Sequence, residues 1–335
     1  MEQIEPERMK VFVTGETGQV VKALIKLADQ DRLDVYTAGR PWLDLSELTD
    51  DTKCEHLSSM IEDISPDVIV NAAAYTNVDK AQEEGDMAAA VNASGAGAVA
   101  MVARKLGLPI IQISTDYVFD GSKSAEIFDE DNPEYSDYDA EDIADIKANV
   151  DDGTYKEGDL TNPKSVYGQT KLEGEKLVAY VNPCHVILRT SWVYSETGNN
   201  FLKTMLRVGA EREEVGVVDD QFGAPTHADA IAAGIVQIVK NLVESPENEE
   251  LYGVFHMTCR GTTSWHGFAE AIFKASSLAG GPNPKLNAIT TEEYPLPAPR
   301  PVNSRLNCEK IARVHNVRLP AWEDLIMKTV VKVLG

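Results

Sequence analysis

Short apolar runs alternate with helix-like stretches along the first half of the chain. The runs are KVFV, LDVYT, DVIVNAAA, LPIIQIS and HVILRTS, at residues 10–13, 33–37, 67–74, 108–114 and 185–191. They are rich in β-branched residues, which is typical of strands buried on both faces of a sheet. Because helical patterns separate them, notably an alanine-rich stretch over 86–106, we predict an α/β fold with a Rossmann-type doubly wound parallel sheet.

The composition changes after the last of these runs. The later segments mix helices with proline-rich loops such as YPLPAPRP at 294–301. We therefore predict an NAD(P)-binding Rossmann domain over residues 9–190. A smaller C-terminal, mainly substrate-binding domain is predicted over 191–335, with parts that return to the first domain. Strand-like sequence begins only at Lys10, so residues 1–8 are expected to form an N-terminal extension.

The charge of the chain is concentrated in one segment. The 335 residues carry a net charge of -23, which argues against nucleic acid or an anionic membrane as a partner. Residues Glu126–Leu160 hold fourteen acidic residues and two lysines, a net charge of -12. We interpret the region around 130–160 as an acidic insertion that projects into solvent. The rival hypothesis is a lid that contacts substrate through Tyr135, Tyr138 or Tyr155.

The cysteine pattern indicates that the protein works in a reducing compartment. The spacing of the histidines and cysteines predicts no metal site. The four cysteines are far apart and form no CxxC pair, and the six histidines have no metal-ligand spacing. The N-terminus MEQIEPERMK is not a signal peptide, and no apolar run approaches the length of a membrane span. We therefore expect a cytoplasmic protein.

A glycine-rich turn, TGETGQV at 14–20, follows the first predicted strand. Gly15 and Gly18 allow a pyrophosphate to approach backbone N–H groups at the start of a helix. Two glycines alone also fit an ordinary strand–turn–helix connection. Their position after the first strand of an alternating pattern favours a phosphate loop.

The end of the second predicted strand carries information on cofactor choice. The chain reads TAGRPWLDL at 37–45 and has no acidic residue at the strand end, where NAD-selective proteins usually place one. The Arg40 guanidinium suits a 2′-phosphate, although a solvated loop arginine is the alternative interpretation. Asp44 and Leu45 are expected to flank the adenine. The cofactor is therefore predicted to be NADPH or NADH.

Three residues form a candidate set for reducing a carbonyl group. The fourth strand ends in STDYVFDG at 114–121, which includes Thr115, and VYGQTK follows at 166–171. Tyr167 can donate a proton, and the spacing of four places Lys171 on the same helix face. We expect the lysine to lower the tyrosine pKa from its usual value of about 10 and Thr115 to orient the carbonyl oxygen.

Several motifs together resemble the dTDP-4-dehydrorhamnose reductases of the extended short-chain dehydrogenase/reductase family. They are TGETGQV, NAAAYTNVDKAQ (71–82), STDYVFDG, VYGQTKLEGE (166–175), RTSWVYSETGNNF (189–201), DQFGAPT (220–226) and RPVNSRL (300–306). The resemblance implies reduction of the 4-keto group of dTDP-4-dehydro-L-rhamnose, a dTDP-sugar, by NADPH or NADH. A homodimer is left open. In some relatives an acid early in the first helix helps to hold an intersubunit metal, but Ala23 stands near that position here.

The resemblance also implies roles for single residues. Tyr167 would be the acid, and Lys171 would also hold the nicotinamide ribose. Thr115, Asp116 and Trp192 would contact the sugar nucleotide. The residues implied to contact the cofactor are Gly18, Gln19, Val20, Asp44, Leu45, Ala74, Tyr75 and Thr76.

Two other functions share this fold. A sugar-nucleotide epimerase or dehydratase is one, but a dehydratase is expected to have an acid pair after Thr115, whereas Tyr117 follows Asp116. A non-catalytic regulatory subunit like the methionine adenosyltransferase beta subunit is the other. The SWVYSETGNNF and DQFGAPT segments favour the reductase. Arg300 and Arg305 either meet a diphosphate or tie down the C-terminal loop.

Overall fold

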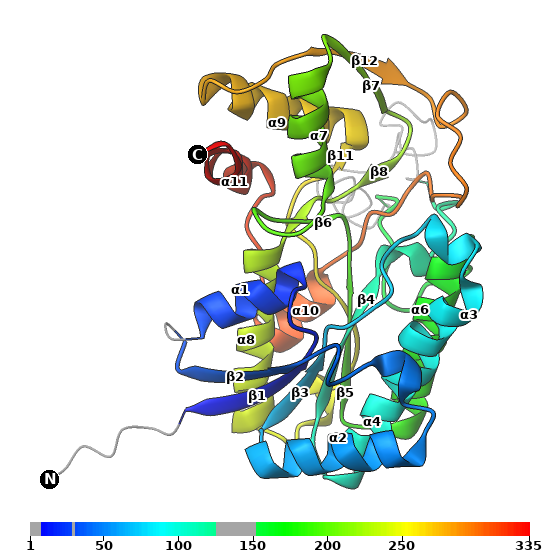
Figure 1. Cartoon of the computed structure of the whole chain (residues 1–335), viewed down its shortest axis with the longest axis vertical. Helices are drawn as coiled ribbons and strands as arrows, with labels where there is room; N and C mark the ends of the chain where they lie inside the picture. Colours follow the sequence, from blue (N-terminus) through cyan, green and yellow to red (C-terminus); the bar gives the residue numbers. More distant parts are fainter. Residues whose placement is uncertain (1–7, 29–30, 125–151) are drawn as a thin grey trace, which may run out of the picture.

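The computed structural model describes residues 8–28, 31–124 and 152–335 and has a large parallel sheet in one of its two lobes (Figure 1). The strand order is β10-β5-β4-β3-β1-β2. Because the order reverses beside β1, a crevice opens there at the carboxyl ends of the strands. The predicted Rossmann-type fold is confirmed, and each of the five predicted runs overlaps a strand. The strands are β1 (Met9–Thr14), β2 (Leu33–Ala38), β3 (Val68–Asn71), β4 (Ile110–Thr115), β5 (His185–Thr190) and β10 (Gly253–His256).

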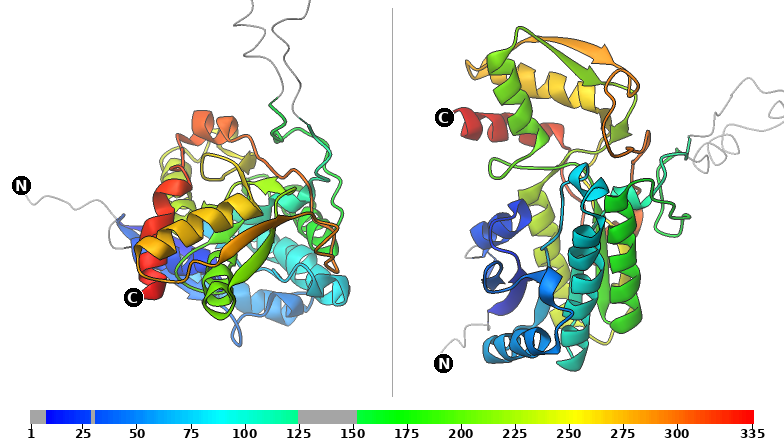
Figure 2. Two further views of the ribbon diagram at one scale, coloured as in Figure 1. Left: turned by 90° about the horizontal axis from the view of Figure 1, so that it is seen from above. Right: turned by 45° about the vertical axis from the view of Figure 1, so that its right-hand side comes forward.

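Helices cover both faces of this sheet (Figures 1 and 2). Alternate residues of β1 point to opposite faces, as a strand requires. Val11 and Val13 pack in the core that includes α1 (Gln19–Leu27) and α8 (Ala228–Glu244). Phe12 packs in the second core. That core includes α2 (Asp51–Ile64), α4 (Ala96–Lys105) and α6 (Val166–Val181).

A long apolar helical run forms part of the second core. It comprises α3 (Gly85–Ala89), the π-helical turn η3 (Ala90–Gly95) and α4. The run Gly85–Lys105 is long and apolar enough to cross a membrane, but 61% of its apolar window is buried inside the fold. It packs against α6, so it serves as a core helix here. A π-turn inside an α-helix is rare and often lies near a functional site.

The second lobe is built on three helices and a parallel strand pair (Figure 2). The helices are α7 (Phe201–Glu211), α9 (Trp265–Leu278) and α11 (Glu323–Leu334), and the strands are β7 (Glu214–Val218) and β12 (Lys285–Ile289). Within the predicted second domain, 191–335, β10 pairs with β5 and α8 packs on α1, so these two elements lie in the first lobe. The remaining short elements are η1 (Leu45–Glu47), η2 (Lys80–Gln82), η4 (Asp116–Val118), β6 (Val193–Tyr194), β8 (Phe222–Gly223), β9 (Thr226–His227), η6 (Glu249–Leu251), β11 (Thr263–Ser264) and α10 (Glu309–His315).

A bidentate ion pair joins the C-terminal segment to the first lobe. Arg300 Nη1 and Nη2 lie 2.7 Å from Asp79 Oδ1 and 2.7 Å from Oδ2, respectively. The Ala298 backbone N–H also donates to Asp79. The attraction of Arg300 holds the pKa of the Asp79 carboxyl below its usual value. Of the two roles left open for Arg300, this structure gives it that of tying down the C-terminal segment.

The described end of the acidic segment, from residue 152, includes a buried tyrosine. Residues 125–151, including Tyr135 and Tyr138, lie outside the described part of the chain, as do residues 1–7 of the predicted N-terminal extension. Tyr155, expected in the solvated body, is instead 3% exposed and stacks on Phe119 with ring centroids 4.1 Å apart. Its hydroxyl donates to Asp120 at 3.1 Å. The prediction of a solvated insertion is therefore wrong at Tyr155, whereas Asp152, Lys156, Gly158 and Leu160 are exposed.

The two described ends of this segment are held together from outside it. The Asn303 side-chain amide donates to the Lys123 carbonyl at 2.6 Å and to the Gly153 carbonyl at 2.7 Å. Lys123 also forms an ion pair with Asp159 at 2.8 Å. The C-terminal segment thus closes the base of the insertion.

Replacing Tyr155 by alanine should destabilise the protein by about 3 kcal/mol, because a large buried ring and its stacking partner are lost. The matched control is Tyr180→Ala, since Tyr180 is 90% exposed and its loss should change the free energy of unfolding by less than about 0.5 kcal/mol. Denaturant unfolding of both variants provides the measurement. Equal stabilities for the two variants would show that the packing of Tyr155 contributes nothing.

Candidate active site

The predicted phosphate loop connects β1 to α1. Gly15 has a φ of 95°, a left-handed conformation that favours glycine, and its N–H donates to the Ala38 carbonyl. Gly18 is the N-cap of α1 and offers no side chain to the first turn. The N–H groups at the start of α1 are therefore available to an anion such as a pyrophosphate.

A cleft of about 590 Å³ lies at this edge of the sheet, beside the second lobe. It brings together most of the residues predicted for the site. Those that line it are Gly18, Gln19, Val20, Ala74, Thr76, Thr115, Asp116, Tyr167, Lys171 and Trp192. Gly15, Arg40, Asp44, Leu45 and Tyr75 do not line it.

The predicted adenine-binding residues lie beyond the cleft and make contacts of their own. Arg40 is an exposed side chain whose Nε lies 3.9 Å from the Asp44 carboxylate. Asp44 caps η1 by accepting from Ser46 N–H at 3.0 Å, and Leu45 is buried in the core beside η3. Their contacts with a cofactor remain predictions.

The segment around Tyr75 is held by a buried asparagine. Asn92, in the π-turn η3, accepts from Tyr75 N–H at 2.9 Å and donates to the Tyr75 carbonyl at 3.0 Å. Its amide also donates to the Thr170 hydroxyl on α6. The Tyr75 hydroxyl donates to Glu84 at 2.7 Å. We did not predict Asn92 from the sequence, although an asparagine within an alanine-rich helix was a signal.

Tyr167 and Lys171 lie on one face of α6, toward the end of β4. Ser165 caps the helix by accepting from Gly168 N–H at 3.2 Å. Lys171 Nζ donates to the Ile113 carbonyl at 2.6 Å. The Thr115 hydroxyl, at the end of β4, donates to Asp116 Oδ1 at 3.0 Å. Residues distant in sequence thereby converge on one point.

Burial has the largest effect on the pKa values of Tyr167 and Lys171. It raises the pKa of Tyr167 to about 12, against the opposing effect of a hydrogen bond with Thr115. It lowers the pKa of Lys171 to about 8, against the attraction of Glu175. The expectation that Lys171 lowers the Tyr167 pKa is wrong for this structure, because desolvation outweighs any help from the ammonium group. Tyr167 therefore carries its proton at neutral pH, which is the state that a proton donor requires.

Asp116 lines the cleft and has one buried carboxylate oxygen, Oδ2, that makes no hydrogen bond of standard geometry among the described residues. The Ser304 hydroxyl lies near this carboxylate and partly opposes the effect of burial on its pKa. Burial raises the pKa of Asp116 to about 7, so near neutral pH both charge states are populated. An unsatisfied buried oxygen is costly, and a ligand hydroxyl would satisfy it.

Two stacked tryptophans form an apolar wall of the cleft. The rings of Trp192 and Trp265 lie 3.6 Å apart and 8° from parallel. Trp192 has a φ of 45°, which is unusual for a large residue. Gly223 makes room for it, since a Cβ there would lie 2.6 Å from the Trp192 ring. We did not predict Trp265 from the sequence.

Two glycines inside α6 allow the helix to approach its neighbours closely. A Cβ on Gly168 would lie 2.2 Å from the Tyr117 carbonyl oxygen, and one on Gly174 would lie 2.0 Å from the Asn92 carbonyl oxygen. Glycine weakens a helix interior, so two of them in one helix point to a packing requirement.

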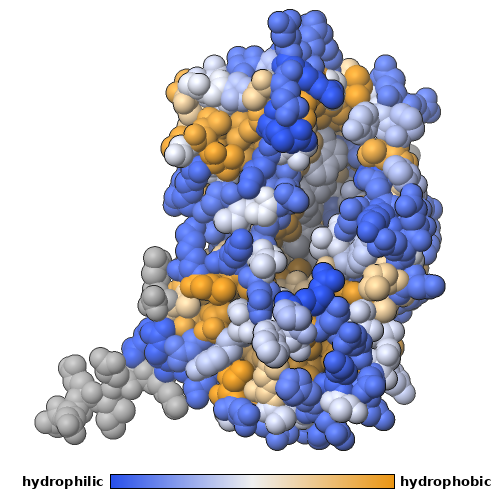
Figure 3. All heavy atoms as spheres, in the orientation of Figure 1, coloured by the Kyte–Doolittle hydropathy of each residue, from blue (hydrophilic) through white to orange (hydrophobic). Residues whose placement is uncertain are grey.

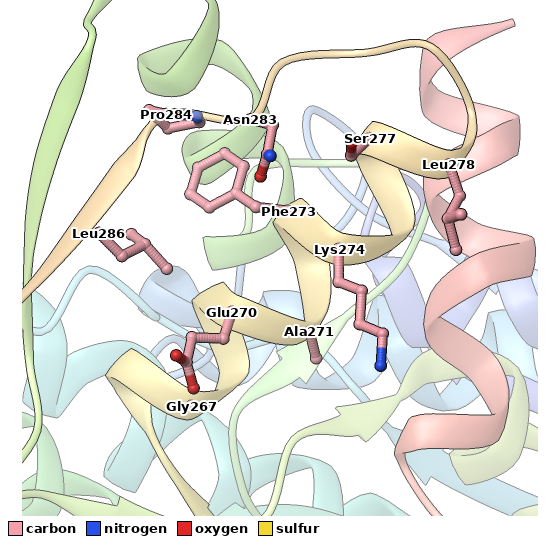
Figure 4. Close-up of a pocket in the computed structure, with 10 residues that line it drawn as sticks. All are labelled: Gly267, Glu270, Ala271, Phe273, Lys274, Ser277, Leu278, Asn283, Pro284 and Leu286. Carbon is pink, nitrogen blue, oxygen red and sulfur yellow. The ribbon is translucent and has the colours of Figure 1, made fainter.

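A larger hollow lies elsewhere and contains none of this chemistry. It measures about 740 Å³ and lies between α9 and β12 (Figure 4). Its lining includes Glu270, Phe273, Lys274 and Leu286 but no residue of the phosphate loop or of α6. Among the described residues, no group of three or more His, Cys, Asp or Glu could hold a metal ion. The cleft beside β4 is therefore the candidate active site.

Comparisons with known proteins agree over nearly the whole chain. The family model described as RmlD substrate binding domain matches residues 9–334. The chain is 42% identical over 317 residues to dTDP-4-dehydrorhamnose reductase of Sinorhizobium fredii, covering 94% of this chain and 95% of that protein. It is 38% identical over 321 residues to the Escherichia coli K12 protein of the same name, with 94% and 95% covered. The structure of dTDP-4-dehydrorhamnose reductase from Bacillus anthracis in complex with NADP is similar at a TM-score of 0.78 and 31% identity, covering 97% of this chain and 99% of that one.

Replacing Gly168 by alanine should destabilise the fold by about 1–3 kcal/mol, because α6 must move away from the Tyr117 carbonyl. Gly158→Ala is the matched control, since a Cβ there meets nothing within 4 Å. Thermal unfolding measures both. A Gly168→Ala variant as stable as the control would contradict the close approach.

Proposed function

The chain belongs to the dTDP-4-dehydrorhamnose reductase family, and on that premise we propose that it reduces the 4-keto group of dTDP-4-dehydro-L-rhamnose to give dTDP-L-rhamnose. A nicotinamide cofactor, NADPH or NADH, supplies the hydride when bound. The observation that supports this proposal most directly is that Thr115, Tyr167 and Lys171 line the same cleft as the start of α1.

The first lobe has the features needed to hold such a cofactor. Its pyrophosphate would lie against the N–H groups that follow Gly15 and Gly18, where the helix dipole favours an anion. Gln19 is already bonded to the second lobe through Ser195 and Asn200, so its position is fixed before binding. We propose further cofactor contacts from Val20, Asp44, Leu45, Ala74, Tyr75 and Thr76.

The protein residues would complete the reduction by transferring one proton. Tyr167 would donate its phenolic proton to the carbonyl oxygen, and a bound cofactor would supply the hydride, so that the C=O group would become CH–OH. The phenolate that remains is stabilised by the positive charge of Lys171. The Thr115 hydroxyl orients the same oxygen, and its hydrogen bond strengthens as negative charge develops there.

The other residues of the cleft would select and orient the sugar nucleotide. Asp116 Oδ2, which makes no hydrogen bond of standard geometry within the described part of the chain, accepts a hydroxyl of the sugar. The stacked Trp192 and Trp265 rings offer a flat apolar surface to the deoxysugar or the thymine ring.

We also propose a cytoplasmic location, with neither nucleic acid nor membrane as a partner. The net charge of -23 supports this proposal, because both of those partners are anionic. One face of the molecule is largely hydrophilic, with hydrophobic residues in smaller separate groups (Figure 3). A homodimer stays open.

A single assay separates the proposed reaction from the two alternatives. Purified protein, NADPH and dTDP-4-dehydro-L-rhamnose are mixed, and NADPH loss and dTDP-L-rhamnose formation are both followed. The proposal requires one NADPH consumed for each sugar reduced. An epimerase would convert the sugar without net loss of NADPH, and a non-catalytic subunit would produce neither change.

Replacing Tyr167 by phenylalanine should lower kcat about 10²–10⁴-fold, because the proton donor is removed while the ring stays. Cofactor affinity, measured by quenching of protein fluorescence, should stay close to that of the wild type. Lys171→Ala should weaken both turnover and cofactor binding. Near-normal turnover by Tyr167→Phe, with chemistry as the slow step, would exclude the proposed proton donor.

Replacing Arg40 by alanine should raise the KM for NADPH about tenfold and leave the KM for NADH unchanged. The reason is the loss of one charge-assisted contact with the 2′-phosphate. Steady-state kinetics with each cofactor provides the measurement. Equal losses for NADPH and NADH would leave Arg40 as a solvated loop residue.

A further inference from the structure

The end of β4 is bonded to α6 through residues beyond the proposed catalytic set. The Ile113 carbonyl accepts from Lys171, and the Ser114 hydroxyl donates to Glu175 Oε1 at 2.5 Å. Glu175 follows Lys171 by four residues and so lies one turn further along the same helix face. Two successive β4 residues therefore fix two successive turns of α6.

Glu175 is one half of a buried ion pair. Arg189, on β5, donates to both carboxylate oxygens, from Nη2 to Oε2 at 2.7 Å and from Nε to Oε1 at 3.0 Å. Glu175 is 3% exposed and Arg189 is 4% exposed. The guanidinium carbon also lies 5.2 Å from the centre of the Phe119 ring. The hydrogen bonds from Arg189 and Ser114 hold the Glu175 carboxylate in a fixed position.

A buried ion pair of this kind is seldom explained by stability alone. Apolar residues of similar volume often give an equally stable core, because desolvating two charges is costly. A third buried charged residue, Lys171, lies four residues before Glu175 on the same helix face and is 4% exposed. A lysine in that position loses its proton readily unless an anion is close.

We propose that Glu175 is a positioning residue for the reaction, whose carboxylate, held by Arg189 and Ser114, maintains the positive charge of Lys171 at neutral pH. This inference deepens the proposed function and rests on it, since the charge of Lys171 matters only if Lys171 serves the reduction. Glu175 acts through Lys171 and not on the substrate.

The other ionisable groups around Lys171 cannot supply a constant negative charge at neutral pH. On α6, Tyr167 stays neutral up to high pH. On η4, burial raises the pKa of Tyr117 above its usual range and that of Asp116 to about 7, so neither gives a constant negative charge at neutral pH. Arg189, on β5, is a cation. Burial lowers the pKa of Lys171, and the attraction that opposes this shift comes from Glu175.

The test is a direct titration of Lys171 in the protein without cofactor or substrate. Lysine labelled with ¹³C at Cε is followed by NMR against pH, and the Lys171→Met variant assigns the signal. Glu175→Gln should lower the pKa of Lys171 by about one unit or more, because its charged neighbour is lost. Ser114→Ala is the matched control. It removes a β4–α6 hydrogen bond without removing a charge, so it should lower stability and leave the titration unchanged.

Turnover provides the second measurement. A lower Lys171 pKa means that the ammonium group is lost at lower pH, so the descending limb of kcat against pH should move down by the same amount. Glu175→Gln should then stay within about threefold of wild-type kcat at pH 6 and fall about fivefold below it at pH 8. Asp116→Asn shows which part of the profile comes from Asp116. A pair with a purely structural role would lower kcat equally at both pH values.

A second variant covers the case in which Glu175→Gln does not fold. The double variant Glu175→Gln/Arg189→Met removes both charges of the ion pair and so leaves no unpaired guanidinium. It should also lower the Lys171 pKa, by a smaller amount, because the repulsion from Arg189 is lost as well. An unchanged Lys171 titration in whichever of the two variants folds would overturn the proposal. Because the titration uses no substrate, a wild-type protein that failed to reduce the dTDP-sugar would refute the proposed function without deciding this point.

Discussion

A helix can come within contact distance of a neighbouring backbone only where it carries no Cβ, and α6 has glycines at two such points. At Gly168 it meets the carbonyl of Tyr117, and at Gly174 it meets the carbonyl of Asn92. This approach allows Lys171 to reach the Ile113 carbonyl and Glu175 to reach Ser114. Without it, the proton donor and the strand end that faces it would be separated by a layer of side chains.

The close packing also creates the unusual electrostatics of the cleft. Lys171, Glu175, Arg189 and Asp116 are each less than 5% exposed, so none is stabilised by bulk water. Their charges depend on one another, and Asp116 still has an oxygen that makes no hydrogen bond of standard geometry with the described residues. Such a site lowers the stability of the protein without its ligand, and binding recovers part of the loss. The strained Trp192 backbone belongs to the same pattern, since it is held by Gly223 and Trp265.

Much of the architecture could be predicted from local patterns, because buried parallel strands are continuous apolar runs. The sixth strand, β10, was missed because its sequence, GVFH, has only two apolar side chains and so gives no continuous apolar run. The cleft residues on α6 could be predicted from a spacing of four. The pairing of Glu175 with Arg189 could not be predicted, since Glu175 lies on α6 and Arg189 lies on β5. The predicted direction of the Tyr167 pKa shift was wrong, because the depth of burial cannot be derived from the spacing.

Tyr155 was misplaced for a related reason. Its neighbours in sequence are acidic, but its packing partner Phe119 lies 36 positions earlier.

The amide of Asn303 bonds to carbonyls on both sides of the acidic insertion, at Lys123 and at Gly153. Whatever sequence joins these two points, its ends are already fixed next to each other by a residue that does not belong to it. The entropy of closing such a loop rises only by about 0.6 kcal/mol for each doubling of its length. The length and the net charge of the segment at this position can therefore change during evolution with little effect on folding. For protein engineering, a reporter domain could be inserted at the same position. An inserted domain whose two termini lie close together would not strain the rest of the protein.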